Sequence, residues 1–188
     1  MSEITPALAF LLTRRSRPYK LLGKPVPSKG EVATFLTAAA RTPDHGKLEP
    51  WRFVVLEEKA LRRLAPLARE RAIATGQDPD KAAGQFEVSP FAIVVVESPV
   101  ESEKIPAIEQ TYSAGAVCLA LLNAALGAGW GANWLSGFAS HDRAFVETGL
   151  GLAQHERVAG IIHIGTAKDT PPDRPRPDIG QKTRWIAQ

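Results

Sequence analysis

The residues best suited to chemistry begin with an arginine pair near the N-terminus. Arg14, Arg15 and Ser16 are consecutive and follow a short apolar run. Two guanidinium groups and a hydroxyl can bind a phosphate or a ring carbonyl through charge-assisted hydrogen bonds. The same arginines could instead only complement the negative end of a helix dipole. The segment is therefore a candidate anion-binding site, with helix capping as the alternative.

A second candidate segment runs from Arg41 to His45. Pro43 stops the preceding helix, and Asp44 can close an Asx turn that presents His45 on a rigid loop. Because histidine serves many structural roles, the alternative is a surface or capping histidine. The sequence Pro50-Trp51 follows shortly after this loop.

A third candidate segment lies at the end of a predicted strand. Trp134, Leu135 and Ser136 are followed by Gly137, and a glycine there lets a ligand approach the backbone closely. The alternative is a packed tryptophan followed by an ordinary turn. In all three segments the polar residues stand at the ends of elements, where binding residues often occur.

Several enzyme classes lack their sequence motifs. Gly149 and Gly151 follow a helical segment, and Gln154 stands where a dinucleotide fingerprint has its third glycine. The sequence contains no GxxxxGK(S/T) phosphate loop, and Ser136 lies outside a GxSxG elbow. Its four histidines share no metal-ligand spacing. We therefore expect neither a hydrolase nor a metal site.

The composition is that of one globular domain. The chain has 188 residues, of which 44% are apolar and 23% charged, and this length can bury a sizeable core. The 23 basic residues are scattered among 20 acidic ones, so we expect no nucleic-acid partner. Cys118 is the single cysteine; we interpret it as an inert buried thiol and expect a cytoplasmic protein.

An uncharged stretch from Thr111 to Ser140 is long enough to suggest a membrane span. Asn123 lies in its middle, and a glycine series that begins at Gly127 interrupts the helix. A helix that is apolar on every side is buried in a core or between subunits. We therefore expect no membrane partner and a buried central helix.

The remaining patterns predict an α+β fold in a single domain over residues 1–188. The alternating β-α-β rhythm of a parallel sheet is absent from the first half. Residues 18–27 are predicted to be an extended connector, 77–88 polar and partly helical, and 170–188 an extended tail. We predict helices at about 6–15, 28–41, 59–75, 106–128 and 141–149, and strands at 51–57, 91–97, 130–136 and 158–165.

The order of these motifs resembles the flavin-dependent nitroreductase family. A helix ends in Arg-Arg-Ser, and a second helix ends in Arg-Thr-Pro-Asp-His before Pro-Trp. Ser-Ala-Gly then opens an alanine-rich helix that precedes Trp-Leu-Ser-Gly. The match spans about residues 8–166 and is most similar to the small, single-domain branch. The resemblance implies FMN, an intertwined homodimer, and a mostly antiparallel central sheet flanked by helices, with the long buried helix at the dimer interface.

The resemblance also implies roles for particular residues. Arg14, Arg15 and Ser16 correspond to the first FMN-contacting motif, and Trp134 to Ser136 correspond to the third. Arg41 and His45 correspond to a loop that contacts the flavin of the partner subunit. Ala124 falls at a position implied for the nicotinamide donor.

The implied activity is the reduction of a small-molecule acceptor, a nitroaromatic or a quinone, by NAD(P)H. Donor and acceptor would use one flavin face in turn, which implies a ping-pong mechanism without a catalytic side chain. Two alternatives remain: a non-catalytic flavin-binding module, and another FMN-dependent reaction such as dehydrogenation or dehalogenation.

Two positions depart from the family pattern. Glu49 stands where the family usually has glutamine, and Leu135 is apolar where some relatives are basic. Both could alter substrate preference. Arg174 and Arg176 in the tail resemble no firm motif, although larger members of the family place a basic residue near the phosphate from their tail.

Overall fold

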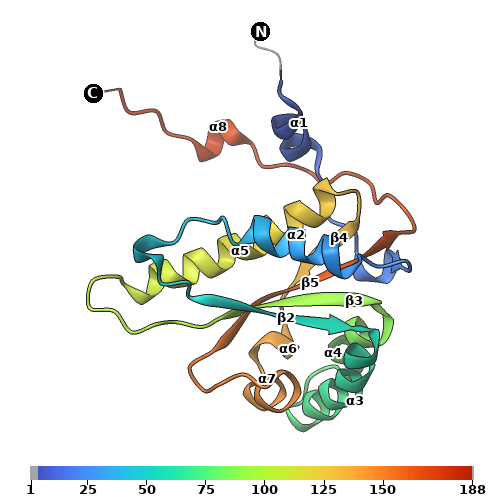
Figure 1. Ribbon diagram of the computed structural model, residues 1–188. Coiled ribbons are helices and arrows are strands. Elements are labelled where there is room, and N and C mark those ends of the chain that lie inside the picture. The colour runs from blue at the N-terminus through green and yellow to red at the C-terminus, as the bar shows by residue number, and fades with distance from the viewer. Residues whose placement is uncertain (1–3, 188) are drawn as a thin grey trace.

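The computed structural model describes residues 4–187 and is built around a five-stranded sheet (Figure 1). Every strand pairing among these residues is antiparallel. The long last strand pairs with three others, β1, β3 and β4, and β2 pairs with the outer side of β3. The strands are β1 (Leu22–Gly23), β2 (Trp51–Glu57), β3 (Phe91–Glu97), β4 (Gly131–Leu135) and β5 (Arg157–Ala167). The predicted α+β class and mostly antiparallel sheet are confirmed.

The central strand β3 is buried along its whole length. Its side chains alternate between the two faces of the sheet, as strand geometry requires. Val94 and Val96 belong to one hydrophobic cluster, whereas Ile93 and Val95 belong to the other. The continuous apolar run at residues 91–97 therefore correctly predicted a strand that is covered on both faces.

Helices cover both faces of this sheet (Figure 1). One face carries α2 (Lys29–Ala39) and α5 (Ala107–Gly127). The opposite face carries four helices: α3 (Glu58–Ala74), α4 (Pro79–Val88), α6 (Phe138–His141) and α7 (Arg143–Leu150). The site described below lies around α5 and the ends of β4 and β5.

The long helix α5 confirms the expected central helix, with Pro106 and Ala128 as its caps. One side buries Val117, Cys118 and Leu121 against the sheet. The other side exposes large apolar residues, namely Ile108, Tyr112 and Leu119. Its place at a dimer interface stays a prediction. Within residues 4–187, no helix is both long and apolar enough to cross a membrane.

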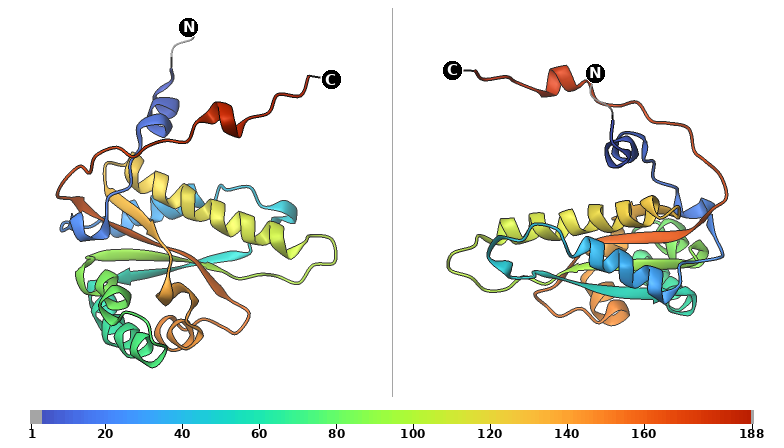
Figure 2. Two further views of the ribbon diagram at one scale, coloured as in Figure 1. Left: turned by 180° about the vertical axis from the view of Figure 1, so that it is seen from behind. Right: turned by 45° about the horizontal axis from the view of Figure 1, so that its top comes forward.

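The two ends of the chain leave the body on the same side (Figure 2). Helix α1 (Pro6–Thr13) begins at its Thr5 cap and buries none of its residues. It exposes three leucines, Leu8, Leu11 and Leu12. The tail beyond β5 is extended except for a short helix, α8 (Ile179–Lys182), which the sequence analysis did not predict.

Three predicted segments differ in detail from the structure, because tertiary contacts or capping residues determine their secondary structure. The connector at 18–27 contains a turn of 3₁₀ helix, η1 (Tyr19–Leu21), and then β1, where Leu22 pairs with Ala167. Residues 79–88 form a complete helix, because Asp78 caps it and Phe86 is buried. The predicted helix at 141–149 is two helices, divided at Asp142, whose side chain accepts a hydrogen bond from the backbone of Phe145.

Candidate functional site

The first candidate segment lies just beyond α1, which ends at Thr13 rather than Arg15. The backbone N–H of Arg17 donates to the carbonyl of Ala132 at 2.8 Å, and this bond fixes the segment beside β4. Arg14 donates from Nη2 to Ser16 Oγ at 3.0 Å, and Arg15 donates from Nη1 to the Ser16 carbonyl at 3.1 Å. The first candidate segment therefore lies beside β4, the strand that also carries Trp134 and Leu135 of the third candidate segment.

A third arginine approaches this pair from the tail. Arg15 donates from Nε to the carbonyl of Pro172 at 3.2 Å, which holds the tail against the segment. The pKa of Arg14 is lowered, first by burial and then by the positive charges of Arg176 and Arg15. Both neighbouring arginines therefore act on the charge of Arg14, while the carboxylate of Asp173 lies 2.6 Å from Nη2 of Arg176.

The Arg14 guanidinium also has an unsatisfied donor. Its Nε is buried and has no hydrogen-bond partner among the residues that the structure describes. A buried donor within a cluster of like charges is costly unless an anion neutralises it. The side-chain donors of Arg14 and Arg15 go to Ser16 and Pro172, whereas only the backbone N–H of Arg14 caps α1, by donating to the Phe10 carbonyl at 2.7 Å.

The third candidate segment forms the end of β4 and the turn after it. Trp134 and Leu135 pair with Ile162 and Ile161 of β5, and Ser136 is exposed just beyond the strand. Gly137 has φ 152°, in the region that favours glycine. The turn therefore places two exposed residues, Ser136 and Gly137, next to Trp134, which is itself 37% exposed.

Ala124 lies on α5, where it packs against the core cluster on that face of the sheet. Its neighbour Asn123 has a buried Oδ1 that no residue within 4–187 contacts by a hydrogen bond. The role implied for Ala124 toward a nicotinamide donor stays a prediction.

The second candidate segment lies at the N-terminal end of α5. His45 belongs to η2 (His45–Lys47), and its Nδ1 is 2.6 Å from Oε2 of Glu109. The Ser113 hydroxyl donates to the Pro43 carbonyl at 3.0 Å. Together with Tyr112 and Ala116 these residues line a cavity of about 330 Å³, which sequence reasoning missed.

The loop that carries His45 has a strained backbone. Lys47 and Glu49 both have positive φ, 55° and 49°, although neither is a glycine. Asp44 stabilises this conformation by accepting a hydrogen bond from the Glu49 backbone at 2.7 Å, which replaces the expected Asx turn. Such strain is typical of segments whose position serves a function.

Within one chain, His45 and Arg41 do not meet the arginine cluster. Phe10, four residues before Arg14, lies against Gly127 at the C-terminal end of α5. His45 contacts Glu109 in the first turn of the same helix. These two positions on α5 are roughly 27 Å apart at 1.5 Å per residue. One copy of the chain therefore carries two parts of the candidate site at opposite ends of one helix.

Comparison with known proteins gives the class of protein that this fold and site define. Residues 11–166 match the model of the nitroreductase family. The chain is 34% identical over 164 residues to the protein of Escherichia coli (strain K12) named "Putative NAD(P)H nitroreductase YdjA", which covers 85% of this chain and 87% of that protein.

Solved structures agree with this match. A nitroreductase-like family protein from Bacillus cereus aligns over 100% of both chains with a TM-score of 0.80 and 25% identity. An FMN-dependent nitroreductase from Clostridium difficile R20291 covers 95% of this chain and 98% of its own, with a TM-score of 0.69 and 20% identity. The chain belongs to the nitroreductase family.

Proposed function

We propose that this protein is a cytoplasmic, homodimeric FMN-dependent oxidoreductase that uses NAD(P)H to reduce nitroaromatic or quinone-type acceptors by a ping-pong mechanism. The observation that carries the proposal is the cluster of Arg14, Arg15 and Arg176, in which the buried Nε of Arg14 lacks a partner among the described residues. A phosphate group supplies the missing acceptor and neutralises the charge. The cluster therefore fits the phosphate of FMN.

Other residues of the chain would hold the rest of the cofactor. The Ser16 hydroxyl is already oriented by Arg14, and the exposed residue Ser136, just beyond β4, could hydrogen-bond a ring carbonyl or ring nitrogen. When bound, FMN supplies the redox chemistry by accepting two electrons from NAD(P)H and passing them to the acceptor. A guanidinium near the ring would stabilise negative charge on it; because Arg14 is assigned to the phosphate, we assign this role to Arg15.

Dimerisation would complete the site. Arg41 and His45 lie at the far end of α5 from the arginine cluster, so they can reach a flavin only if it belongs to a second copy. The exposed apolar residues of α5 and α1 offer a surface for that second copy. A similar relative is named as an NAD(P)H enzyme, and a structural neighbour is described as FMN-dependent. Both names support the choice of cofactor and donor.

The test begins with the purified protein. We expect it to be yellow and to release FMN on denaturation. Anaerobic addition of NADH or NADPH should bleach the visible flavin band, and menadione or nitrofurazone should restore it. A protein that binds FMN but is bleached by neither donor would be a flavin-binding module, and the proposed activity would be rejected.

Steady-state kinetics test the ping-pong mechanism separately. Because one flavin face serves donor and acceptor in turn, double-reciprocal plots against NAD(P)H at several acceptor concentrations should give parallel lines. Intersecting lines would indicate a ternary complex and would contradict a single shared face.

A further inference from the structure

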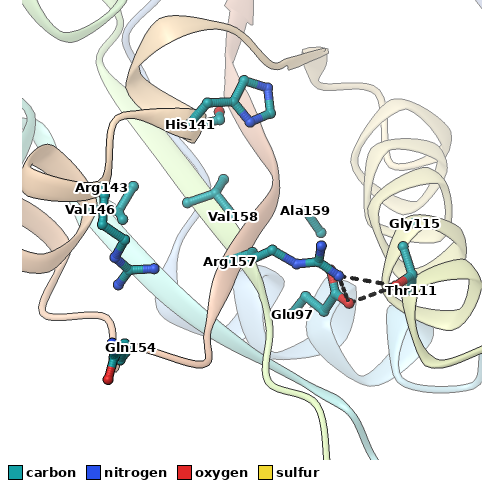
Figure 3. A pocket seen from close by; sticks show the side chains of 11 residues that line it. Glu97, Thr111, Gly115, His141, Arg143, Val146, Gln154, Arg157, Val158 and Ala159 are labelled. Atoms are coloured by element: carbon teal, nitrogen blue, oxygen red, sulfur yellow. Dashed lines mark hydrogen bonds and ion pairs between the residues drawn. The ribbon is translucent and has the colours of Figure 1, made fainter. Parts of the chain in front are cut away.

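A cavity of about 530 Å³ has no role in the proposal above (Figure 3). It opens between the N-terminal half of α5, the helices α6 and α7, and the start of β5. Its lining residues with polar side chains are Glu97, Thr111, Ser140, His141, Arg143, Gln154 and Arg157.

Two cavity-lining residues, Ala159 and His141, are close in the chain to residues at the third candidate segment. Ala159 lines the cavity and directly precedes Gly160, which the Trp134 indole covers. His141 stands on α6, which begins two residues after Ser136. A small molecule in the cavity would therefore lie beside the surface where we place the flavin ring.

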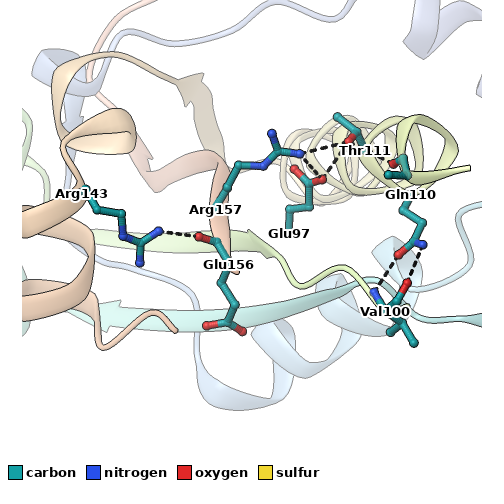
Figure 4. A network of polar contacts seen from close by, with 8 residues as sticks. Glu97, Val100, Gln110, Thr111, Arg143, Glu156 and Arg157 are labelled. Atoms are coloured by element: carbon teal, nitrogen blue, oxygen red, sulfur yellow. Dashed lines mark hydrogen bonds and ion pairs between the residues drawn. The ribbon is translucent and has the colours of Figure 1, made fainter. Parts of the chain in front are cut away.

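Arg157 is held in a fixed position at the cavity wall. Its Nη2 donates to Glu97 Oε1 at 2.6 Å and to Thr111 Oγ1 at 3.2 Å, and Thr111 donates to the same carboxylate oxygen at 2.7 Å (Figure 4). Glu97 is buried, with only 5% of its side chain exposed, whereas 63% of the Arg157 side chain is exposed. The buried carboxylate thus anchors one nitrogen of the guanidinium and leaves the remainder accessible.

The two arginines of this cavity differ in their free donors. Arg143 uses all three guanidinium nitrogens, on Glu147 and on the carbonyls of Leu152, Ala153 and Glu156. Arg157 uses only Nη2 within the described residues, so its Nε and Nη1 can still donate. Because Nη2 belongs to both two-pronged edges of a guanidinium, Nε and Nη1 can each donate one separate charge-assisted hydrogen bond to an oxygen of a carboxylate or a phosphate.

His141 stands on a different wall of the cavity from Arg157 and is exposed (Figure 3). The charged and titratable groups that line the cavity are one carboxylate, Glu97, against two guanidiniums and this imidazole. Arg157 pairs with Glu97 and Arg143 pairs with Glu147, so the free Nε and Nη1 donors of Arg157, rather than a surplus of positive charge, favour the oxygens of an anionic ligand over a cation.

We infer that Arg157, with His141 across the cavity, binds an anionic oxygen group of a small-molecule substrate. That group is either the carboxylate of an anionic acceptor or a phosphate of the nicotinamide donor. The inference rests on the proposed function, because it places the cavity beside the flavin of an oxidoreductase. It adds a residue that selects substrates by their charge.

The test uses the holoprotein as purified and isothermal titration calorimetry, which does not depend on turnover. The ligand pairs are 4-nitrobenzoate against neutral 4-nitrobenzyl alcohol, and NADP⁺ against NAD⁺. Loss of a charged hydrogen bond should weaken binding by about 10- to 100-fold. We expect Arg157→Gln to have this effect either on 4-nitrobenzoate or on the two nucleotides, NADP⁺ and NAD⁺. Binding of 4-nitrobenzyl alcohol should be unchanged, and Arg157→Lys should restore part of the loss.

The affected ligand identifies the source of the anion. A loss confined to 4-nitrobenzoate assigns the subsite to the acceptor, and a loss confined to the nucleotides assigns it to a donor phosphate. Arg69→Gln is the matched control, because Arg69 also bonds carboxylates, Asp80 and Glu87, but lies on α3 outside the cavity. This control should change neither ligand pair.

Loss of Arg157 alone would leave Glu97 buried without its cation, so the double variant Glu97→Gln with Arg157→Gln is measured as well. Its thermal melting should match that of the wild type, and its binding losses should match those of Arg157→Gln. Equal changes for charged and neutral ligands, or no change in a folded variant, would overturn the inference. The proposed function is judged independently by FMN content and by bleaching with NAD(P)H.

Discussion

The indole of Trp134 on β4 lies over Gly160 on the neighbouring strand β5, in the space that a side chain at position 160 would occupy. A Cβ atom there would overlap Nε1 of the indole. Gly160 is also buried and pairs with Val95 on its other side. The position of the third candidate segment therefore depends on a glycine in the sheet, and this glycine gave no signal in the sequence.

We predict that Gly160→Ala displaces the Trp134 indole, because backbone on both sides prevents β5 from moving away. The expected result is a changed tryptophan fluorescence spectrum, about 1–3 kcal/mol lower free energy of unfolding, and weaker FMN binding. Fluorescence, chemical unfolding and flavin titration measure these three effects. Gly30→Ala is the control, since a Cβ at Gly30 meets no atom within 4 Å. Unaltered fluorescence in the folded variant would contradict the packing.

Arg52 and Glu156 form a two-pronged ion pair between β2 and the residue before β5. The distances are 2.6 Å from Nε to Oε1 and 2.7 Å from Nη2 to Oε2. The Arg52 hydrogen bond lowers the pKa of Glu156 from 4.5 to about 2. Because the folded-state pKa is depressed, the stabilisation is complete above the unfolded pKa and is lost as the pH falls from about 4.5 toward 2.

We predict that Glu156→Gln lowers the free energy of unfolding at neutral pH by about 1–3 kcal/mol. Between pH 4.5 and 2 the difference between variant and wild type should shrink. Urea unfolding at a series of pH values measures both. Glu147→Gln, in the exposed pair with Arg143, should cost less than about 1 kcal/mol. A constant difference across the acid range would show that the pair does not cause the shift.

Local signals in the sequence predicted much of the fold. The helix predicted from residue 28 begins at its Ser28 cap, where Ser28 and Glu31 form a capping box with both reciprocal hydrogen bonds, and the apolar run at 91–97 forms the buried strand. The helix α4 was predicted only as a partly helical segment because Gly84 and Gln85 interrupt its apolar pattern, although Asp78-Pro79 is a strong start signal. The two-residue strand β1 exists only through its pairing with β5, which no local pattern encodes.

The candidate site was predictable only in pieces. The sequence identified the segments that contain Arg14 and Trp134 separately. The structure brings them together because the backbone of Arg17 donates a hydrogen bond to Ala132 on β4, the strand that carries Trp134. Arg176 belongs to the site by virtue of the path of the tail, which has no core of its own. Arg157 and Glu97 are distant in the sequence and meet only because β3 and β5 pair. Such long-range contacts depend on topology, which single motifs do not contain.

The exposed apolar side of α5 leads to a prediction about assembly. Leu119 is 46% exposed in the single chain, and we place it in the dimer interface. Leu119→Asp should shift the sedimentation coefficient from dimer to monomer and reduce FMN content, because a second copy completes the site. Ile73→Asp is the matched control, since Ile73 is 65% exposed on α3. A wild-type monomer loaded with FMN at micromolar concentration would refute the shared site.

Cys118 is fully buried on the sheet side of α5, and burial raises the pKa of its thiol to about 12. Since the thiolate is the reactive form, we predict that the native protein does not react with Ellman's reagent. One thiol should react after unfolding in guanidinium chloride. Cys118→Ala should keep FMN binding while losing some stability through the smaller side chain. Rapid labelling of the native protein would show that this core opens readily.

The arginine cluster gives opposite expectations for the protein with and without its cofactor. Without FMN, the charge of Arg14 is disfavoured by burial, Arg176 and Arg15, so Arg14→Gln should leave the melting temperature of the apoprotein unchanged or raise it. With FMN, the same change would remove the proposed charged hydrogen bond to the phosphate and should weaken binding by about 1.5–3 kcal/mol.

Flavin titration and thermal melting of the apoprotein measure these two effects, and Lys81→Gln, an exposed charge on α4, controls for net charge. If the cluster only stabilised the folded chain, Arg14→Gln would lower the melting temperature and leave FMN affinity unchanged. The opposite pattern, a stable apoprotein with weak FMN binding, would show that the cluster is maintained for an anion, because the Asp173 carboxylate is paired with Arg176 and leaves Nε of Arg14 without an acceptor.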